Sequence, residues 1–283
     1  MTADWFDETL HPSLRARLRI DKLIYEGKSE HQHLVLFENE TFGRVLALNG
    51  VIQTTERDEF IYHEMLAHVP LLAHGHVRNV LIIGGGDGGM LEEVLKHKTV
   101  SQATLVEIDA GVIEFSKKYL RSICGNAFED PRAHIVIADG VDHVETTDQR
   151  YDVIIVDSTD PVGPGEALFT DRFYTACKGC LAPGGILVTQ NGVPFLQADE
   201  LRSTLAVLTR LFSKATCYTA TVPGYVGGCM AFGWASDDAE LRATPLDVLE
   251  QRFADSALDT RYYTPAVHQA AFALPGYIGS LTA

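Results

Sequence analysis

The hydrophobic pattern changes near residue 79, and this change constrains the fold more than any other feature of the chain. From there on, short and almost continuously apolar runs alternate with stretches of helical spacing, at residues 80–83, 104–108, 135–138, 153–157 and 186–190. Such strands are buried on both faces, which is typical of a parallel sheet covered by helices. Two further runs, 215–221 and 229–234, are separated only by a short turn, so we expect them to pair antiparallel.

Seven strands that end in a hairpin predict an α/β, doubly wound fold of the methyltransferase-like kind, with a mostly parallel sheet. Residues before about 57 show a different, β-like pattern, at 34–37, 44–48 and 51–55, with Asn49-Gly50 as a hairpin signal. We therefore expect a small N-terminal β-strand domain over residues 1–57 and a Rossmann-like domain over residues 58–283.

A helix is expected to connect the two domains. Thr55 and Asp58 resemble a capping box, and apolar side chains recur at helical spacing between residues 62 and 69. Because proline has no N–H group and disrupts a helix interior, Pro70 is expected to end this helix.

The chain is acidic, with 38 Asp and Glu against 23 Lys and Arg and a formal net charge of -15. This balance disfavours nucleic acid and anionic membranes as partners and suits a cationic partner. No apolar stretch approaches the roughly 20 residues of a membrane span, and the acidic N-terminus lacks a signal-peptide pattern. We therefore expect a cytoplasmic protein.

Five cysteines, an odd number, lie mostly in or beside apolar runs, which argues against a disulfide framework. Cys177 and Cys180 form a CxxC pattern, but no second pair at zinc spacing accompanies them. Residues 173–181 are expected to be helical, so we interpret both as ordinary helix thiols.

The glycine loop 84–89 follows the first parallel strand and allows the backbone to approach a nucleoside closely. Gly84, Gly86 and Gly89 satisfy the GxGxxG pattern, which by itself fits both dinucleotide dehydrogenases and S-adenosyl enzymes. Asp87 favours the second class, because a carboxylate repels a pyrophosphate and attracts a sulfonium or ammonium group.

Acidic residues stand at the ends of three consecutive strands, where ligands bind in open α/β sheets. Glu107 is placed to accept hydrogen bonds from ribose hydroxyls, and Asp139-Gly140 to contact an adenine amino group. Asp157 ends the fourth strand, and Asp160-Pro161 begins an extended loop that could cover the site. We expect this loop, residues 158–169, to become ordered when ligand binds.

Five segments together resemble the spermidine synthase family, the polyamine aminopropyltransferases, and closely resemble its enterobacterial branch. They are LNGVIQTTERDE (48–59), GGGDGG (84–89), DSTDPVGP (157–164), RYY (261–263) and AFALP (271–275). The resemblance covers almost the whole chain, in order and at similar spacing, and is more specific than any single motif.

This resemblance implies transfer of an aminopropyl group from decarboxylated S-adenosylmethionine to putrescine, giving spermidine and methylthioadenosine. No metal and no separate cofactor is expected, and the partners would be these two substrates and further copies of the chain, as a homodimer or homotetramer. Asp157 would be the catalytic carboxylate. The residues implied to bind the nucleoside co-substrate are Gln32, Gly84, Gly86, Asp87, Glu107, Asp139, Gly140 and Pro164. Those implied to bind the amine are Tyr62, His63, Asp87, Asp157, Asp160 and Tyr225, although Gly224 replaces the polar residue that the family commonly has before this tyrosine.

Two alternatives remain open. An S-adenosylmethionine-dependent methyltransferase of small molecules shares the fold and the acidic strand ends, but the pair Asp157 and Asp160 and the N-terminal β-domain argue against it. A non-catalytic polyamine-binding protein would retain the pocket, and the intact acidic pair disfavours it.

Overall fold

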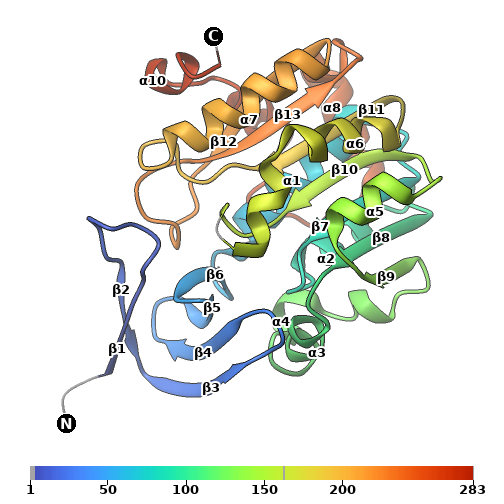
Figure 1. Cartoon of the computed structure of the whole chain (residues 1–283). Helices are drawn as coiled ribbons and strands as arrows, with labels where there is room; N and C mark the ends of the chain where they lie inside the picture. Colours follow the sequence, from blue (N-terminus) through green and yellow to red (C-terminus); the bar gives the residue numbers. More distant parts are fainter. Residues whose placement is uncertain (1–3, 162, 283) are drawn as a thin grey trace.

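The computed structural model describes residues 4–161 and 163–282, and it contains three sheets within this part of the chain (Figure 1). The central sheet has seven strands in the order β12-β13-β11-β10-β7-β8-β9. Neighbours from β11 to β9 pair parallel, whereas β13 pairs antiparallel with β11 and with β12. This order confirms the doubly wound fold. The strands are β7 (Asn79–Gly84), β8 (Gln102–Glu107), β9 (Ala133–Ile137), β10 (Tyr151–Asp157), β11 (Leu181–Gln190), β12 (Lys214–Ala220) and β13 (Met230–Ser236).

Helices cover both faces of this sheet, which explains why its strands are apolar without alternation. In β7, Val80 and Ile82 pack in one core cluster with side chains of α1 (Glu59–His74), α2 (Gly89–Lys96) and α8 (Leu246–Ser256). Leu81 and Ile83 pack in a second cluster with α5 (Gly140–Thr146), α6 (Asp171–Cys180) and α7 (Ala198–Leu211). The remaining helical segments are α3 (Ala110–Tyr119), α4 (Arg121–Cys124), α9 (Pro265–Ala271), α10 (Gly276–Gly279) and the 3-10 turns η1 (Ala127–Glu129), η2 (Gly163–Phe169) and η3 (Leu241–Ala243).

Helix α1 differs from the prediction at both ends. The Asp58 side chain makes no capping hydrogen bond to the helix and instead accepts hydrogen bonds from Thr55 Oγ1 and from the Gly224 N–H group. The helix also continues through Pro70 to His74 and ends at Gly75, which has a left-handed φ of 79°. All residues from 61 to 73 are buried, so packing offsets the one hydrogen bond that the proline removes.

The N-terminal part forms a four-stranded antiparallel sheet of β3 (Lys22–Lys28), β4 (His33–Asn39), β5 (Gly43–Leu48) and β6 (Val51–Thr55). Asn49 and Gly50 both have positive φ, 50° and 83°, as a two-residue hairpin turn requires. A separate ribbon of β1 (Asp4–Asp7) and β2 (Arg17–Ile20) precedes it. Figure 1 shows these blue strands beside the central sheet. The domain boundary predicted after residue 57 falls in the turn between β6 and α1 and stays a prediction.

The cysteines agree with the expectation from the sequence. All five are free and four of them are buried, with Cys177 and Cys180 on α6. Among the described residues, no helix combines the length and the apolar character that crossing a membrane requires.

Candidate active site

A cavity of about 250 Å³ lies at the carboxyl ends of β7, β8 and β10 and is closed on one side by the N-terminal strands. It brings together all the site residues that the sequence predicted, except Pro164, which lies in η2 and whose side chain is outside the described part of the structure. The predicted residues in its lining are Gln32, Tyr62, His63, Gly84, Gly86, Asp87, Glu107, Asp139, Gly140, Asp157, Asp160 and Tyr225.

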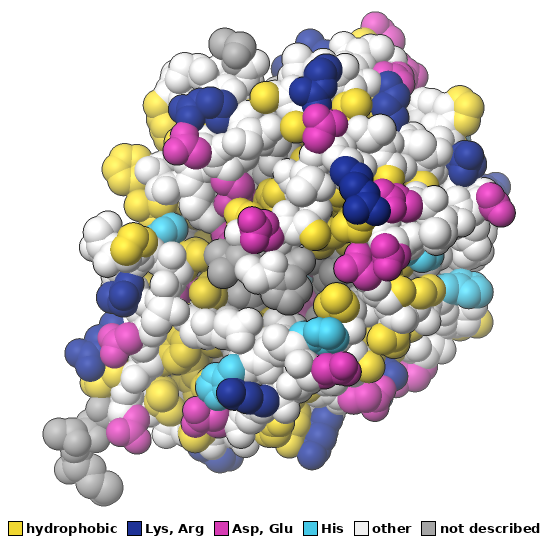
Figure 2. Space-filling view, viewed as in Figure 1, with side chains coloured by type: hydrophobic (Ala, Val, Ile, Leu, Met, Phe, Trp, Pro, Cys, Tyr) yellow, Lys and Arg dark blue, Asp and Glu magenta, His cyan; other side chains and the backbone are white. Residues whose placement is uncertain are grey.

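The charge of this cavity is predominantly negative. Six acidic side chains line it, and the described lining includes neither lysine nor arginine. On the face shown in Figure 2, acidic, histidine and hydrophobic side chains are interspersed with lysine and arginine. A cavity of this kind attracts cations and repels phosphate groups. The acidic lining side chains are Glu8, Asp87, Glu107, Asp139, Asp157 and Asp160.

The glycine loop is packed so tightly against neighbouring strands that side chains do not fit. Gly84 has a φ of 83°, and a Cβ atom there would clash with the carbonyl oxygen of Asp157. A Cβ atom on Gly86 would lie 2.9 Å from the Glu107 carboxylate. Asp87 then turns back, and its Oδ1 accepts a hydrogen bond of 3.0 Å from the Gly89 N–H group. The loop therefore places the Asp87 carboxylate beside Asp157 at the end of β10.

Asp157 is held at the centre of the site by Tyr62, whose hydroxyl donates a hydrogen bond of 2.6 Å to Oδ1. Burial raises the pKa of Asp157 to about 6; the charge of His63 opposes this rise, and the carboxylate of Asp87 adds to it. An ordinary aspartate has a pKa near 3.9. The environment therefore makes Asp157 a stronger base than an exposed aspartate.

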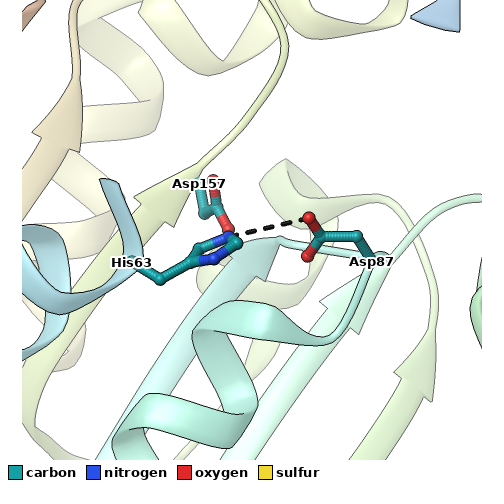
Figure 3. A group of neighbouring side chains, drawn as sticks. All are labelled: His63, Asp87 and Asp157. Atoms are coloured by element: carbon teal, nitrogen blue, oxygen red, sulfur yellow. Dashed lines mark ion pairs between the residues drawn. The ribbon is translucent and has the colours of Figure 1, made fainter. Parts of the chain in front are cut away.

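His63 lies in the cavity wall with a carboxylate near each ring nitrogen. Its Nε2 is 3.6 Å from Asp87 Oδ2, the ion pair drawn in Figure 3, and its Nδ1 is 2.7 Å from Glu59 Oε2. Burial opposes its charge, but the carboxylates of Asp87 and Glu59 outweigh burial and raise its pKa to about 10. At neutral pH the ring is therefore an imidazolium.

The expected nucleoside end of the cavity is also acidic. Glu107 is buried at the end of β8, and its Oε1 accepts a hydrogen bond of 2.9 Å from the Asp109 N–H group. Burial raises the pKa of Glu107 to about 7, against the lowering effect of that hydrogen bond. Asp139 Oδ1 accepts hydrogen bonds from the N–H groups of Val141 and Asp142 at the start of α5. One oxygen of Asp139 is thus used as a helix cap, and its contact with adenine stays a prediction.

The loop after β10 is attached to the rest of the protein by hydrogen bonds that the sequence did not predict. Asp160 Oδ1 accepts a hydrogen bond from Gln197 Nε2 at the start of α7, and the Thr159 carbonyl accepts one from Gln190. The same Gln197 amide donates to Glu200, whose pKa burial raises to about 8. Asp160 therefore has a partner before an amine arrives, and ordering of the loop by ligand stays a prediction.

Tyr225 reaches the cavity from the β12–β13 turn, and its hydroxyl donates a hydrogen bond of 2.6 Å to the Gln53 carbonyl. The preceding Gly224 lies against Asp58, where a Cβ atom would come within 2.9 Å of the carboxylate oxygen. The departure from the family pattern at this position thus coincides with a close contact to the N-terminus of α1.

Several residues of the site were missed by sequence reasoning. Glu8, Gln190 and Gln197 belong to no motif, and only the folded chain brings them to the cavity. Glu59 could have been found, because it lies four residues before His63 on a predicted helix, and side chains at this spacing meet on one face.

Comparison with known proteins matches the chain along nearly its whole length. The family description "spermidine synthase tetramerisation domain" matches residues 4–56, and "spermine/spermidine synthase domain" matches residues 59–245. A polyamine aminopropyltransferase of Ruegeria sp. is 56% identical over 98% of both chains. Polyamine aminopropyltransferase 1 of Pseudomonas aeruginosa is 57% identical over 96% of both, and an Escherichia coli relative is 55% identical over 96% of this chain and 94% of its own.

Solved structures agree with these matches. A spermidine synthase in complex with the transition state analogue AdoDATO has a TM-score of 0.94 and 37% identity, covering 100% of this chain and 96% of its own. The Thermotoga maritima spermidine synthase has a TM-score of 0.91 and 36% identity, covering 100% and 95%. The methyltransferase and the non-catalytic alternatives are thereby set aside. The chain matches the synthase family model and is more than half identical to these relatives along nearly its whole length. It therefore belongs to the spermidine synthase family and is a polyamine aminopropyltransferase.

Proposed function

We propose that this enzyme transfers the aminopropyl group of decarboxylated S-adenosylmethionine to putrescine, forming spermidine and 5'-methylthioadenosine. The observation that supports this best is the predominantly negative charge of the cavity, whose described lining has six acidic side chains, neither lysine nor arginine, and His63 as an imidazolium. Both proposed substrates are cations, and such a cavity offsets the repulsion between them. The relative solved with AdoDATO agrees with a nucleoside co-substrate.

The proposed reaction is a direct displacement. The nitrogen of a neutral putrescine amine forms a bond to the aminopropyl carbon, the bond from this carbon to sulfur breaks, and methylthioadenosine leaves. An alkylammonium with a lysine-like pKa near 10.4 must first lose a proton, which costs roughly 4 to 5 kcal/mol at pH 7. Asp157, with its pKa raised to about 6 and its oxygen fixed by Tyr62, is the proposed acceptor of that proton.

The two ends of the cavity have different proposed tasks. Glu107 and Asp139 stand on the side of β8 and β9, where they would hold the ribose and adenine of the co-substrate. Asp87, beside Asp157, would pair with the ammonium of the aminopropyl group, and Asp160 would meet the acceptor amine. In this arrangement the carboxylates bind and orient both cations before the displacement.

We propose that the reaction needs no metal. Ligand atoms of His63, Asp87 and Asp157 lie within 4.8 Å of one another, a spacing that a metal ion could bridge. However, the imidazolium form of His63 has no free lone pair for a metal. The positive charge of the His63 ring, in place of a metal ion, balances negative charge on Asp87 and Asp157.

The direct test is turnover with the two proposed substrates. Purified enzyme should release methylthioadenosine in an amount equal to the spermidine formed, and a chelator such as EDTA should leave the rate unchanged. Product is measured by chromatography, with ordinary S-adenosylmethionine as the comparison co-substrate. Absence of turnover with putrescine, with turnover on another amine, would contradict the acceptor assignment, and a rate abolished by EDTA and restored by a metal would contradict the metal-free reaction.

Substitution of Glu107 tests the nucleoside end. We expect Glu107→Gln to weaken binding of methylthioadenosine by roughly tenfold to a hundredfold, because charge-assisted hydrogen bonds to the ribose are lost. Isothermal titration at pH 8, where the wild-type carboxylate is ionised, measures the dissociation constant. An unchanged constant would show that Glu107 does not contact the ribose.

Assembly and location complete the proposal. Residues 4–56 match a tetramerisation domain, so the enzyme is proposed to form a homodimer or a homotetramer. A cytoplasmic location is proposed from the sequence features described above.

A further inference from the structure

Glu59 and His63 together span the wall of the cavity. His63 lines the cavity, whereas Glu59 does not, and Nδ1 of the ring is 2.7 Å from Glu59 Oε2. The other nitrogen, Nε2, is 3.6 Å from Asp87 Oδ2. The His63 side chain is only 3% exposed, and that of Glu59 is 13% exposed. The ring thus connects a carboxylate behind the wall with the carboxylates inside it.

The imidazole ring is fixed in this position by its neighbours. A Cβ atom on Gly89 would clash with His63 Cε1, so the first residue of α2 closely adjoins the ring. On another side the ring of Tyr62 contacts it edge-to-face at 5.3 Å. The close packing leaves little room for the ring to turn, and each nitrogen keeps its own carboxylate partner.

Three carboxylates and one aromatic ring surround His63. Asp87 faces it from the glycine loop, Asp157 from β10, and Glu59 and Tyr62 from its own helix. Among the described residues, Glu59 alone makes a hydrogen bond to the ring. Glu59 accepts the hydrogen bond from the Nδ1–H group. The second proton of the imidazolium is then on Nε2, which faces the cavity.

We propose that Glu59 is a positioning residue that holds His63 as a fixed imidazolium, and that this cation keeps Asp157 ionised and ready to accept the proton of the attacking amine. The inference rests on the proposed function, since it assigns a proton to Asp157 during aminopropyl transfer. It explains why an acidic cavity for cationic substrates contains a buried cation.

The direction of the effect follows from the charges. Burial raises the pKa of Asp157, the His63 charge lowers it, and Asp87 raises it. Without the cation, Asp157 would face the like charge of Asp87 alone, and its pKa would rise further. A base must be deprotonated to act. When the pH is lowered, an enzyme without this cation would therefore lose its activity at a higher pH than the wild type does.

The experiment compares pH profiles of kcat/KM for wild type, Glu59→Gln and the control Glu114→Gln. Glu114 is a surface carboxylate on α3, with a 73% exposed side chain that pairs with Lys117. We expect the acid limb of Glu59→Gln to move upward by roughly one pH unit, a tenfold loss of kcat/KM below pH 6 that largely disappears above pH 8.5. The control should follow the wild type.

A uniform loss of activity at every pH would overturn the proposal, because a purely structural role of Glu59 does not move the acid limb of the pH profile. A profile that superimposes on that of the wild type would overturn it as well. If wild-type enzyme shows no aminopropyl transfer at all, the proposed function fails instead. The second measurement does not depend on the variant: nitrogen NMR of labelled wild-type protein should show a doubly protonated His63 ring up to about pH 9. A neutral ring at pH 7.5 would overturn the proposal even if Glu59→Gln does not fold.

Discussion

Asp157→Asn should lower kcat by at least about a hundredfold while methylthioadenosine still binds with nearly unchanged affinity. The amide keeps an oxygen that can accept the 2.6 Å hydrogen bond from the Tyr62 hydroxyl, so the side chain should stay in place. What it loses is the ability to take a proton. Since the nucleoside contacts lie at the ends of other strands, binding of the co-substrate should be little affected.

A pH profile separates this loss from general damage. Without Asp157 as base, only acceptor molecules that are already neutral in solution can react, and their fraction rises about tenfold per pH unit below pH 10. The rate of Asp157→Asn should therefore rise steeply with pH where the wild type is flat. Asp148→Asn, at an exposed position, serves as the control. Near-normal turnover of Asp157→Asn at pH 7.5 would show that another group accepts the proton.

Asp87→Asn should reduce the preference for the decarboxylated co-substrate over ordinary S-adenosylmethionine by at least about tenfold. Ordinary S-adenosylmethionine has an α-carboxylate where the proposed pocket places Asp87 and Asp157. Two like charges about 4 Å apart at an effective dielectric near 20 repel by roughly 4 kcal/mol. The nearby imidazolium of His63, 3.6 Å from Asp87, reduces this repulsion, so the expected change is smaller than the full value.

Calorimetric titration of both co-substrates against both proteins measures this effect. The amide of the Asp87→Asn variant retains an oxygen for the hydrogen bond from the Gly89 N–H group, so the loop should keep its shape. The variant should lose affinity for the decarboxylated form, whose ammonium pairs with Asp87, and gain relative affinity for the ordinary form. If the ratio of the two dissociation constants is equal in wild type and variant, Asp87 is not the charge that discriminates between them.

The central sheet was predictable because its strands are buried on both faces, which produces short continuous apolar runs such as residues 153–156. The strands β1, β2 and β3 were missed, since they contain many charged side chains and are largely exposed, so they lack an apolar run, and the alternation in β2 extends over only four residues. The end of α1 was mispredicted at Pro70 for a related reason. Local propensity argues for a break there, but the helix is buried along its whole middle, and tertiary packing decides.

The site residues show the same difference between what a local sequence pattern reveals and what depends on tertiary packing. Glu107, Asp139 and Asp157 could be found because the carboxyl ends of parallel strands meet at one edge of a sheet. Gln197 was not found, since its contact with Asp160 joins segments 37 residues apart and depends on how α7 packs on the sheet. The charged state of His63 depends partly on Glu59, which the helical spacing could have revealed, and partly on Asp87 from another element, which no local pattern reports.

The shared lining of the cavity constrains how such a chain can evolve. Gln32 and Gln53 come from the segment that matches the assembly domain, whereas Asp87 and Asp157 come from the segment that matches the synthase domain, and all four line one cavity. Recombination between distant homologues at the turn after β6 would combine the N-terminal segment of one protein with the synthase domain of another. The two walls of the cavity would then come from proteins in which they did not evolve together. We therefore expect the short N-terminal segment to be inherited with the rest as one unit, because substitutions in β5 and β6 alter the wall of the cavity.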